Sequence, residues 1–196
     1  MQHVCGVTSR CFYQLRQIRT IRKSLTSETS ELIVLAFISS RLDYCNNILY
    51  GVGAVHLQKL QSVQNEAARV IARKRKYDPI TSTLRDDLHW LPVESRVHFK
   101  QCMLVYTCLH GTAPVYIAEM CIRRCFDSEH YQLRSVVRGE LVVPLAKKVT
   151  LGRRSFRYAG PSLWNALPRD IHDVSLSLSQ FQSKLKTFLY REVYHL

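Results

Sequence analysis

Two groups of side chains in this sequence have types that could bind metal ions, the first of them at a catalytic site. Asp86 and Asp87 are adjacent carboxylates, and paired aspartates hold the two divalent cations of enzymes that transfer phosphoryl groups. Such a site also requires a third carboxylate and a turn between apolar strands, whereas the residues around Arg85 have a helical or irregular pattern. We therefore expect solvated acids at these positions, no catalytic residue and no independent enzyme activity.

The second group is Cys121, Cys125 and His130, which are zinc-ligand types at short spacing. Only three ligands lie close together and their spacing is irregular, so the sequence favours one buried and one exposed thiol over a metal site. We predict no metal and no cofactor. Seven cysteines without a secretion signal indicate reduced thiols inside the cell, in either the nucleus or the cytoplasm.

Basic residues provide the stronger functional signal. The chain has 28 Lys and Arg against 15 Asp and Glu, a formal net charge of +13, and such an excess favours polyanions because each phosphate contact releases a counterion. The alternative is a solvated cationic surface. The candidate nucleic-acid-binding residues form three clusters: Arg16, Arg19, Arg22 and Lys23; Arg69, Arg73, Lys74, Arg75 and Lys76; and Arg153, Arg154 and Arg157.

Aromatic residues accompany the third basic cluster. Phe156 and Tyr158 alternate with its arginines, and Trp164 follows. Arginine beside aromatic rings suits phosphate pairing combined with base stacking. The same three rings could instead belong to the core.

Helical periodicity predicts how the first two clusters are positioned. Residues 4–23 carry an apolar stripe at steps of three and four, with a basic ridge beside it. Thr26 or Ser27 can cap a second helix, which is apolar on most sides over residues 32–49 and is predicted to be the centre of a bundle, ended by Gly51 and Gly53. A third helix is predicted over residues 54–75.

The second half is predicted to be more irregular. A fourth helix begins at Pro92 and ends at Gly111. Residues 123–160 have short apolar runs between cations and glycines, which favours a β-hairpin or an irregular basic loop, and an aromatic anchor follows at 161–168. Ser177 and Gln180 have the spacing of a capping box at the start of a final helix.

These patterns predict a mainly α fold. We expect a helical bundle over residues 1–76, a helical connection over 77–122, and a basic loop or hairpin plus a C-terminal helix over 123–196. The longest apolar run, residues 32–38, is about a third of the length needed to cross a bilayer, so we expect no membrane partner.

Several motifs, in this order and spacing, resemble a known family. They are Phe12-Tyr13-Gln14-Leu15-Arg16; Ser39-Ser40-Arg41-Leu42-Asp43-Tyr44-Cys45-Asn46-Asn47-Ile48-Leu49-Tyr50-Gly51; Leu60-Gln61, Val63-Gln64-Asn65 and Ala67-Ala68-Arg69; Leu88-His89-Trp90-Leu91-Pro92-Val93; Tyr106, Leu109-His110-Gly111, Ala113-Pro114 and Tyr116; Arg134-Ser135; and Arg154-Ser155-Phe156, Gly160-Pro161, Leu163-Trp164-Asn165 and Leu167-Pro168. Together they resemble the C-terminal region of the reverse transcriptase protein of LINE-type non-LTR retrotransposons.

The resemblance implies a function for the first part of the chain. In such proteins an endonuclease and the fingers and palm of an RNA-directed DNA polymerase precede this region, so the palm carboxylates are expected to lie outside the chain. Residues 1–76 would correspond to the thumb, a helical bundle that packs on the template–primer duplex. The expected partners are RNA or an RNA–DNA hybrid and the fingers and palm. The alternative is an orphan structural fragment of a decayed element that self-associates through exposed apolar faces.

Overall fold

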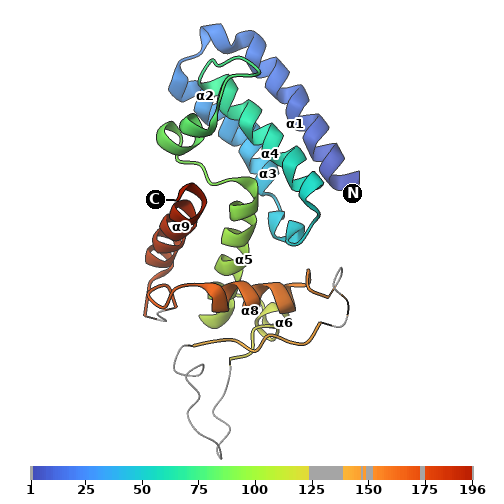
Figure 1. Ribbon diagram of the computed structural model, residues 1–196, viewed down its shortest axis with the longest axis vertical. Coiled ribbons are helices and arrows are strands. Elements are labelled where there is room, and N and C mark those ends of the chain that lie inside the picture. Colours follow the sequence, from blue (N-terminus) through green and yellow to red (C-terminus); the bar gives the residue numbers. More distant parts are fainter. Residues whose placement is uncertain (1, 124–138, 147, 149–151, 173–174, 196) are drawn as a thin grey trace, which may run out of the picture. The chain divides into compact units, whose positions relative to one another are not determined.

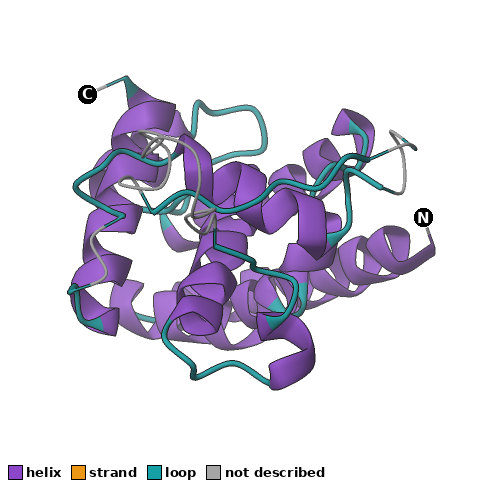
Figure 2. Ribbon diagram, turned by 90° about the horizontal axis from the view of Figure 1, so that it is seen from below, coloured by secondary structure: helices purple, strands orange, loops and turns teal. Residues whose placement is uncertain are grey.

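The computed structural model describes residues 2–123, 139–146, 148, 152–172 and 175–195 of the 196-residue chain. The described part is mainly helical, which confirms the predicted fold class. Figure 2 shows helices and loops within it, and its one β contact is an isolated antiparallel bridge between Arg123 and Leu141. Half of the hairpin or basic loop expected over 123–160, including residues 124–138, lies outside the described residues.

The chain divides into two compact units. The first contains Met1–Asn46, Val52–Arg96 and Val193–Leu196, and the second contains Asn47–Gly51 and Val97–Glu192. Residues 77–96, expected to belong to a connecting region, therefore group with the first helices. The polar contacts of Gln61 and Gln64 account for this, because Gln61 accepts a hydrogen bond from Val93 N at 2.9 Å and Gln64 donates one to Leu91 O at 2.8 Å.

The first unit is a bundle whose main helices are α1 (Gln2–Ile21), α2 (Ser27–Val34) and α4 (Ala54–Ile71). The apolar stripe predicted in the first helix is buried at Val4, Cys11, Leu15 and Ile18. Figure 1 shows α1 and α4 side by side. The predicted cap is confirmed, because the Thr26 hydroxyl accepts a hydrogen bond from Thr29 N at 3.1 Å and starts α2.

The second helix differs from its prediction. It continues from α2 through a π-helical turn, η2 (Leu35–Ser39), into α3 (Ser40–Asp43), and ends there rather than at the glycines. Cys45 has a left-handed φ of +50° just beyond its end. Ile38 is fully buried, but Leu32 and Phe37 remain 67% and 48% exposed, so the helix is not the enclosed centre of the bundle.

The second unit contains most of α5 (Val93–Leu109), with α6 (Val115–Ala118), α8 (Phe156–Ala166) and α9 (Leu178–Tyr194). Its core is aromatic, since the Phe181 ring stacks on Tyr106 and on Trp164 with centroids 4.5 and 5.6 Å apart. The predicted capping box is confirmed: Ser177 N donates to Gln180 Oε1 at 2.9 Å, and Gln180 N donates to Ser177 Oγ at 3.3 Å.

Helix α8 was not predicted, because Pro161 lies inside it and its residues were divided between the expected basic loop or hairpin and the aromatic anchor that follows. A proline inside a helix removes one backbone hydrogen bond and costs about 3 kcal/mol. Here tertiary packing offsets that cost, since Pro161 and Trp164 are both buried in the core of the second unit. The helical periodicity of the sequence does not reveal this stabilisation by tertiary packing.

Candidate nucleic-acid interface

The first two basic clusters meet at a groove between α1 and the end of α4. Its volume is about 250 Å³. It is lined by Phe12, Leu15, Arg16, Arg19, Glu66 and Lys76. We call it the α1–α4 groove. Three cations, one acid and two apolar side chains therefore line a single concave surface.

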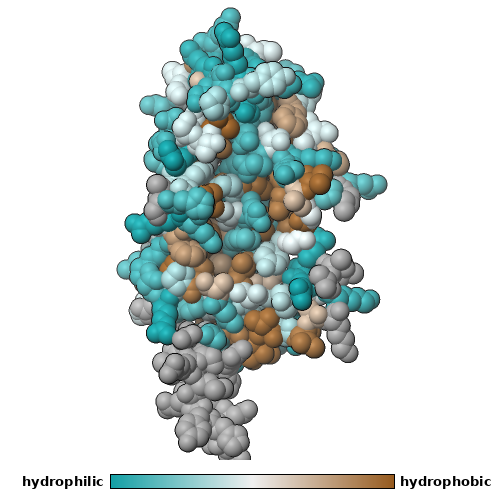
Figure 3. Space-filling view, viewed as in Figure 1, coloured by the Kyte–Doolittle hydropathy of each residue, from teal (hydrophilic) through white to brown (hydrophobic). Residues whose placement is uncertain are grey.

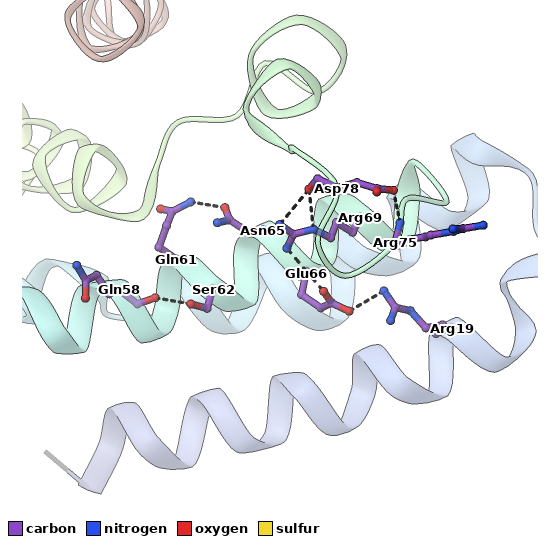
Figure 4. A network of polar contacts seen from close by, with 9 residues as sticks. All are labelled: Arg19, Gln58, Gln61, Ser62, Asn65, Glu66, Arg69, Arg75 and Asp78. Carbon is purple, nitrogen blue, oxygen red and sulfur yellow. Dashed lines mark hydrogen bonds and ion pairs between the residues drawn. The ribbon is translucent and has the colours of Figure 1, made fainter.

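An ion-pair network sets the charge of this groove. Arg19 Nη2 lies 2.6 Å from Glu66 Oε1, and Arg69 Nη1 lies 3.8 Å from Glu66 Oε2. Figure 4 shows Glu66 on α4 between these two arginines, one from each helix. No ion pair joins Arg16 or Lys76 within the described ranges of the chain, so these two cations carry the groove's unneutralised charge.

Arg22, predicted to contact nucleic acid, is instead a buried structural residue. Its side chain is only 6% exposed, and its Nε and Nη2 donate to Val70 O and Ile71 O at 2.8 and 2.6 Å. Nη1 donates to Leu25 O at 2.8 Å. Burial, and then the charge of Arg73, lower the pKa of this guanidinium. Arg22 therefore satisfies the last carbonyls of α4 and cannot reach a phosphate.

Three residues of the second cluster also hold backbone in place. Arg69 donates to Asp78 O at 3.3 and 3.4 Å, and Lys74 donates to Pro79 O at 3.2 Å. Arg73, with a left-handed φ of +55°, donates to Leu25 O at 3.2 Å. Of these, only Arg73 has an exposed side chain.

Besides Arg19 and Arg73, four predicted cations of this unit are exposed, namely Arg16, Lys23, Arg75 and Lys76. The turn that carries the last two is fixed because Arg75 N donates to Asp78 Oδ2 at 2.6 Å. Lys76 Nζ lies 5.2 Å from the ring centroid of Tyr77, which is 87% exposed. In the view of Figure 3 the surface of this unit is mostly hydrophilic, with hydrophobic residues in small patches.

The third cluster belongs to the second unit and is less concentrated. Arg153, Arg154 and Arg157 are exposed, but Arg154 Nε donates to Tyr50 O at 3.3 Å and its stem packs on Gly51. Gly51 has a φ of +66°, so both its conformation and this contact favour glycine. This cluster therefore belongs to a different unit from the residues of the α1–α4 groove.

The aromatic residues near the third cluster have mixed environments. Trp164 is 2% exposed and stacks on His172, so it belongs to the core. Phe156 approaches Gly160 closely, and only Tyr158 lines an open depression together with Arg157 and Pro144. Of the three aromatic residues near this cluster, Tyr158 is therefore the one that remains open to base stacking.

The paired aspartates lie in a helical turn, η4 (Thr83–Asp87), with Asp86 Oδ1 2.7 Å from Arg85 Nε. This hydrogen bond lowers the pKa of Asp86. Of the predicted thiol and histidine set, only Cys121 is described, and its thiol is hydrogen-bonded to Cys108. Within the described residues, no three Asp, Glu, His or Cys side chains gather as a metal site.

Sequence reasoning missed Phe12 and Glu66 as groove residues. Glu66 precedes Arg69 by three positions on a helix, a spacing that signals an ion pair. Its partnership with Arg19 depends on the packing of α1 against α4. Phe12 precedes Arg16 by one helical turn, which places both on one side of α1.

Comparison with known proteins adds no relationship. No protein-family model, no curated protein and no solved structure matches this chain. Among the described residues, no helix combines the length and apolarity that crossing a bilayer requires.

Proposed function

We propose that this chain is a non-catalytic, nucleic-acid-binding part of a non-LTR retrotransposon reverse transcriptase. In this proposal the first unit acts as a thumb that contacts an RNA–DNA hybrid, or the RNA of the element, through its basic surface. The motif resemblance supports the family, and the net charge of +13 supports a polyanionic partner.

One observation carries the proposal for nucleic acid. Two cations without an acidic partner in the described residues, Arg16 and Lys76, line the same groove although they are far apart in sequence. The exposed Lys23, Arg73 and Arg75 extend the cationic surface of this unit. Such a surface binds a phosphate backbone without reading base sequence, because the contacts are to phosphates only.

The test is a salt titration of binding to an RNA–DNA hybrid, using the whole chain. The Arg16→Gln/Lys76→Gln variant removes two charges at the groove. The control, Arg10→Gln/Lys59→Gln, removes two exposed charges elsewhere on α1 and α4. Arg10 lies six positions from Arg16 and therefore about 120° away around the helix.

We expect binding by the unmodified chain to weaken steeply with salt. The groove variant should lose about 0.9 of the logarithmic salt slope for each phosphate contact removed, and the control should keep the slope. Equal slopes for both variants would assign the binding to net charge. Affinity that does not depend on salt would overturn the proposal.

A second candidate function is that of a structural fragment that pairs through apolar surface. Leu32, Leu35 and Phe37 are 67%, 37% and 48% exposed. Exposed apolar side chains favour association. Sedimentation and denaturation of the unmodified chain test this candidate. A chain that sediments as a monodisperse monomer and unfolds cooperatively would exclude it.

A further inference from the structure

The α1–α4 groove differs from a surface that only follows a phosphate backbone. Its floor contains the half-buried Phe12 and the buried Leu15, while Arg16 and Lys76 lie at the same groove. A phosphate contact needs no apolar floor. An aromatic ring beside cations is the arrangement that binds an unpaired base together with its phosphate.

The size and charge of the groove limit what it can hold. A volume of about 250 Å³ is below the range of typical small-molecule sites, so the groove holds no more than one nucleotide. Glu66 is held by Arg19 at 2.6 Å and repels a phosphate from that part of the groove. The phosphate would then bind Arg16 and Lys76, the two lining cations without an acidic partner in the described residues.

We propose that the α1–α4 groove binds one unpaired nucleotide at the end of a nucleic-acid duplex, with its base on Phe12 and its phosphate on Arg16 and Lys76. This inference rests on the proposed function and adds a preference for a strand end. The bound duplex would carry a short single-stranded extension. Duplex binding through the other cations does not require Phe12, so the two proposals can fail separately.

The chain offers a matched pair of variants for the test. Phe12→Ala removes the groove ring, and Tyr13→Ala removes its neighbour, which is 59% exposed and does not line the groove. Phe12→Leu is the second groove variant, because leucine keeps the apolar packing of this half-buried position but has no aromatic face for stacking. Circular dichroism of each variant verifies that the helices remain.

Binding is measured to a blunt RNA–DNA hybrid, to the same hybrid with a short single-stranded DNA extension, and to a deoxynucleoside monophosphate. We expect the unmodified chain and Tyr13→Ala to bind the extended hybrid about tenfold more tightly than the blunt one. Phe12→Ala and Phe12→Leu should lose that preference and keep their affinity for the blunt hybrid.

Each other outcome overturns a specific statement. Equal binding to both hybrids by the unmodified chain overturns the strand-end site while leaving the thumb function intact. Binding of the monophosphate that depends on Phe12, without a preference for the extension, would assign the groove to a free nucleotide. If the unmodified chain binds neither hybrid, the proposed function itself is refuted.

Discussion

Two sides of the first unit are built from different chemistry although they belong to one bundle. At the edge of the contact between α1 and α4, and in the 3₁₀ turn that follows α1, polar groups meet: Arg19 pairs with Glu66, and Arg22 donates to the last carbonyls of α4. The helix formed by α2, η2 and α3 instead buries Ile38 and exposes the adjacent Phe37. The first side suits a polyanion and the second an apolar surface, so the two candidate functions can be separated by mutation.

The largest expected effect concerns the apolar side. Ile38 is fully buried, and Ile38→Ala leaves a cavity, so we expect the free energy of unfolding to fall by about 3 kcal/mol. Phe37→Ala, at the next and half-exposed position, should change it by less than about 1 kcal/mol. Urea denaturation of both variants measures the difference. Similar losses would mean that Phe37 is buried in solution.

The next effect concerns the polar side. Arg22→Met leaves the carbonyl of Ile71 without a side-chain donor and leaves that of Val70 with only the 3.4 Å bond from Arg73 N, and we expect a loss of about 2 kcal/mol in the free energy of unfolding. The exposed neighbour provides the control, since Lys23→Met should change stability by less than about 0.5 kcal/mol. Urea denaturation is again the measurement. Equal stability of the two variants would show that Arg22 is not a structural cap.

Arg22 also shows where sequence reasoning stops. The caps at Thr26 and Ser177 and the stripe of α1 were predictable because they depend on neighbours in the sequence. The first basic cluster was predicted as one ridge because the helical period was extended to Lys23. However, α1 ends at Ile21 and Arg22 begins a 3₁₀ turn, η1 (Arg22–Ser24), so its side chain leaves the ridge and points into the bundle.

The apolar helix illustrates a second limit. A sequence with apolar residues on most sides does not reveal which side the rest of the chain covers. Burial of Ile38 and exposure of Leu32 follow from the packing of α1 and α4, which is tertiary information. The same holds for the candidate site: its cations were predicted from composition, but the groove that gathers Arg16 and Lys76 was not.

Self-association provides an intermediate effect. Leu32→Ser/Phe37→Ser replaces two exposed apolar side chains of α2 and η2, and we expect the dissociation constant of any self-associated form to rise at least tenfold, about 1.4 kcal/mol. Val55→Ser/Tyr77→Ser, at positions 63% and 87% exposed, is the control with little effect. Analytical ultracentrifugation measures both. An equal response would show that association is not specific to α2 and η2.

The hybrid affinity of the Leu32→Ser/Phe37→Ser variant adds a second criterion. If the two sides of the bundle act independently, its binding to an RNA–DNA hybrid should equal that of the unmodified chain, since neither residue lines the α1–α4 groove. A coupled loss of binding would mean that association and nucleic-acid contact involve the same surface.

The smallest effect distinguishes charge from stability within the groove itself. Glu66→Gln and Arg19→Gln both remove the 2.6 Å ion pair, and because Arg19 is partly exposed each should cost about 0.5 kcal/mol of stability, with Glu66→Gln also losing the longer 3.8 Å pair with Arg69. Their effects on hybrid binding should have opposite signs. Glu66→Gln frees Arg19 and removes the groove's acid, so the affinity should rise about threefold, whereas Arg19→Gln should lower it by a similar factor. Fluorescence anisotropy at low salt measures both affinities. Because the variants lose the same ion pair, a fall in affinity for both would show that binding depends on the geometry that the pair maintains and not on the charge of the groove.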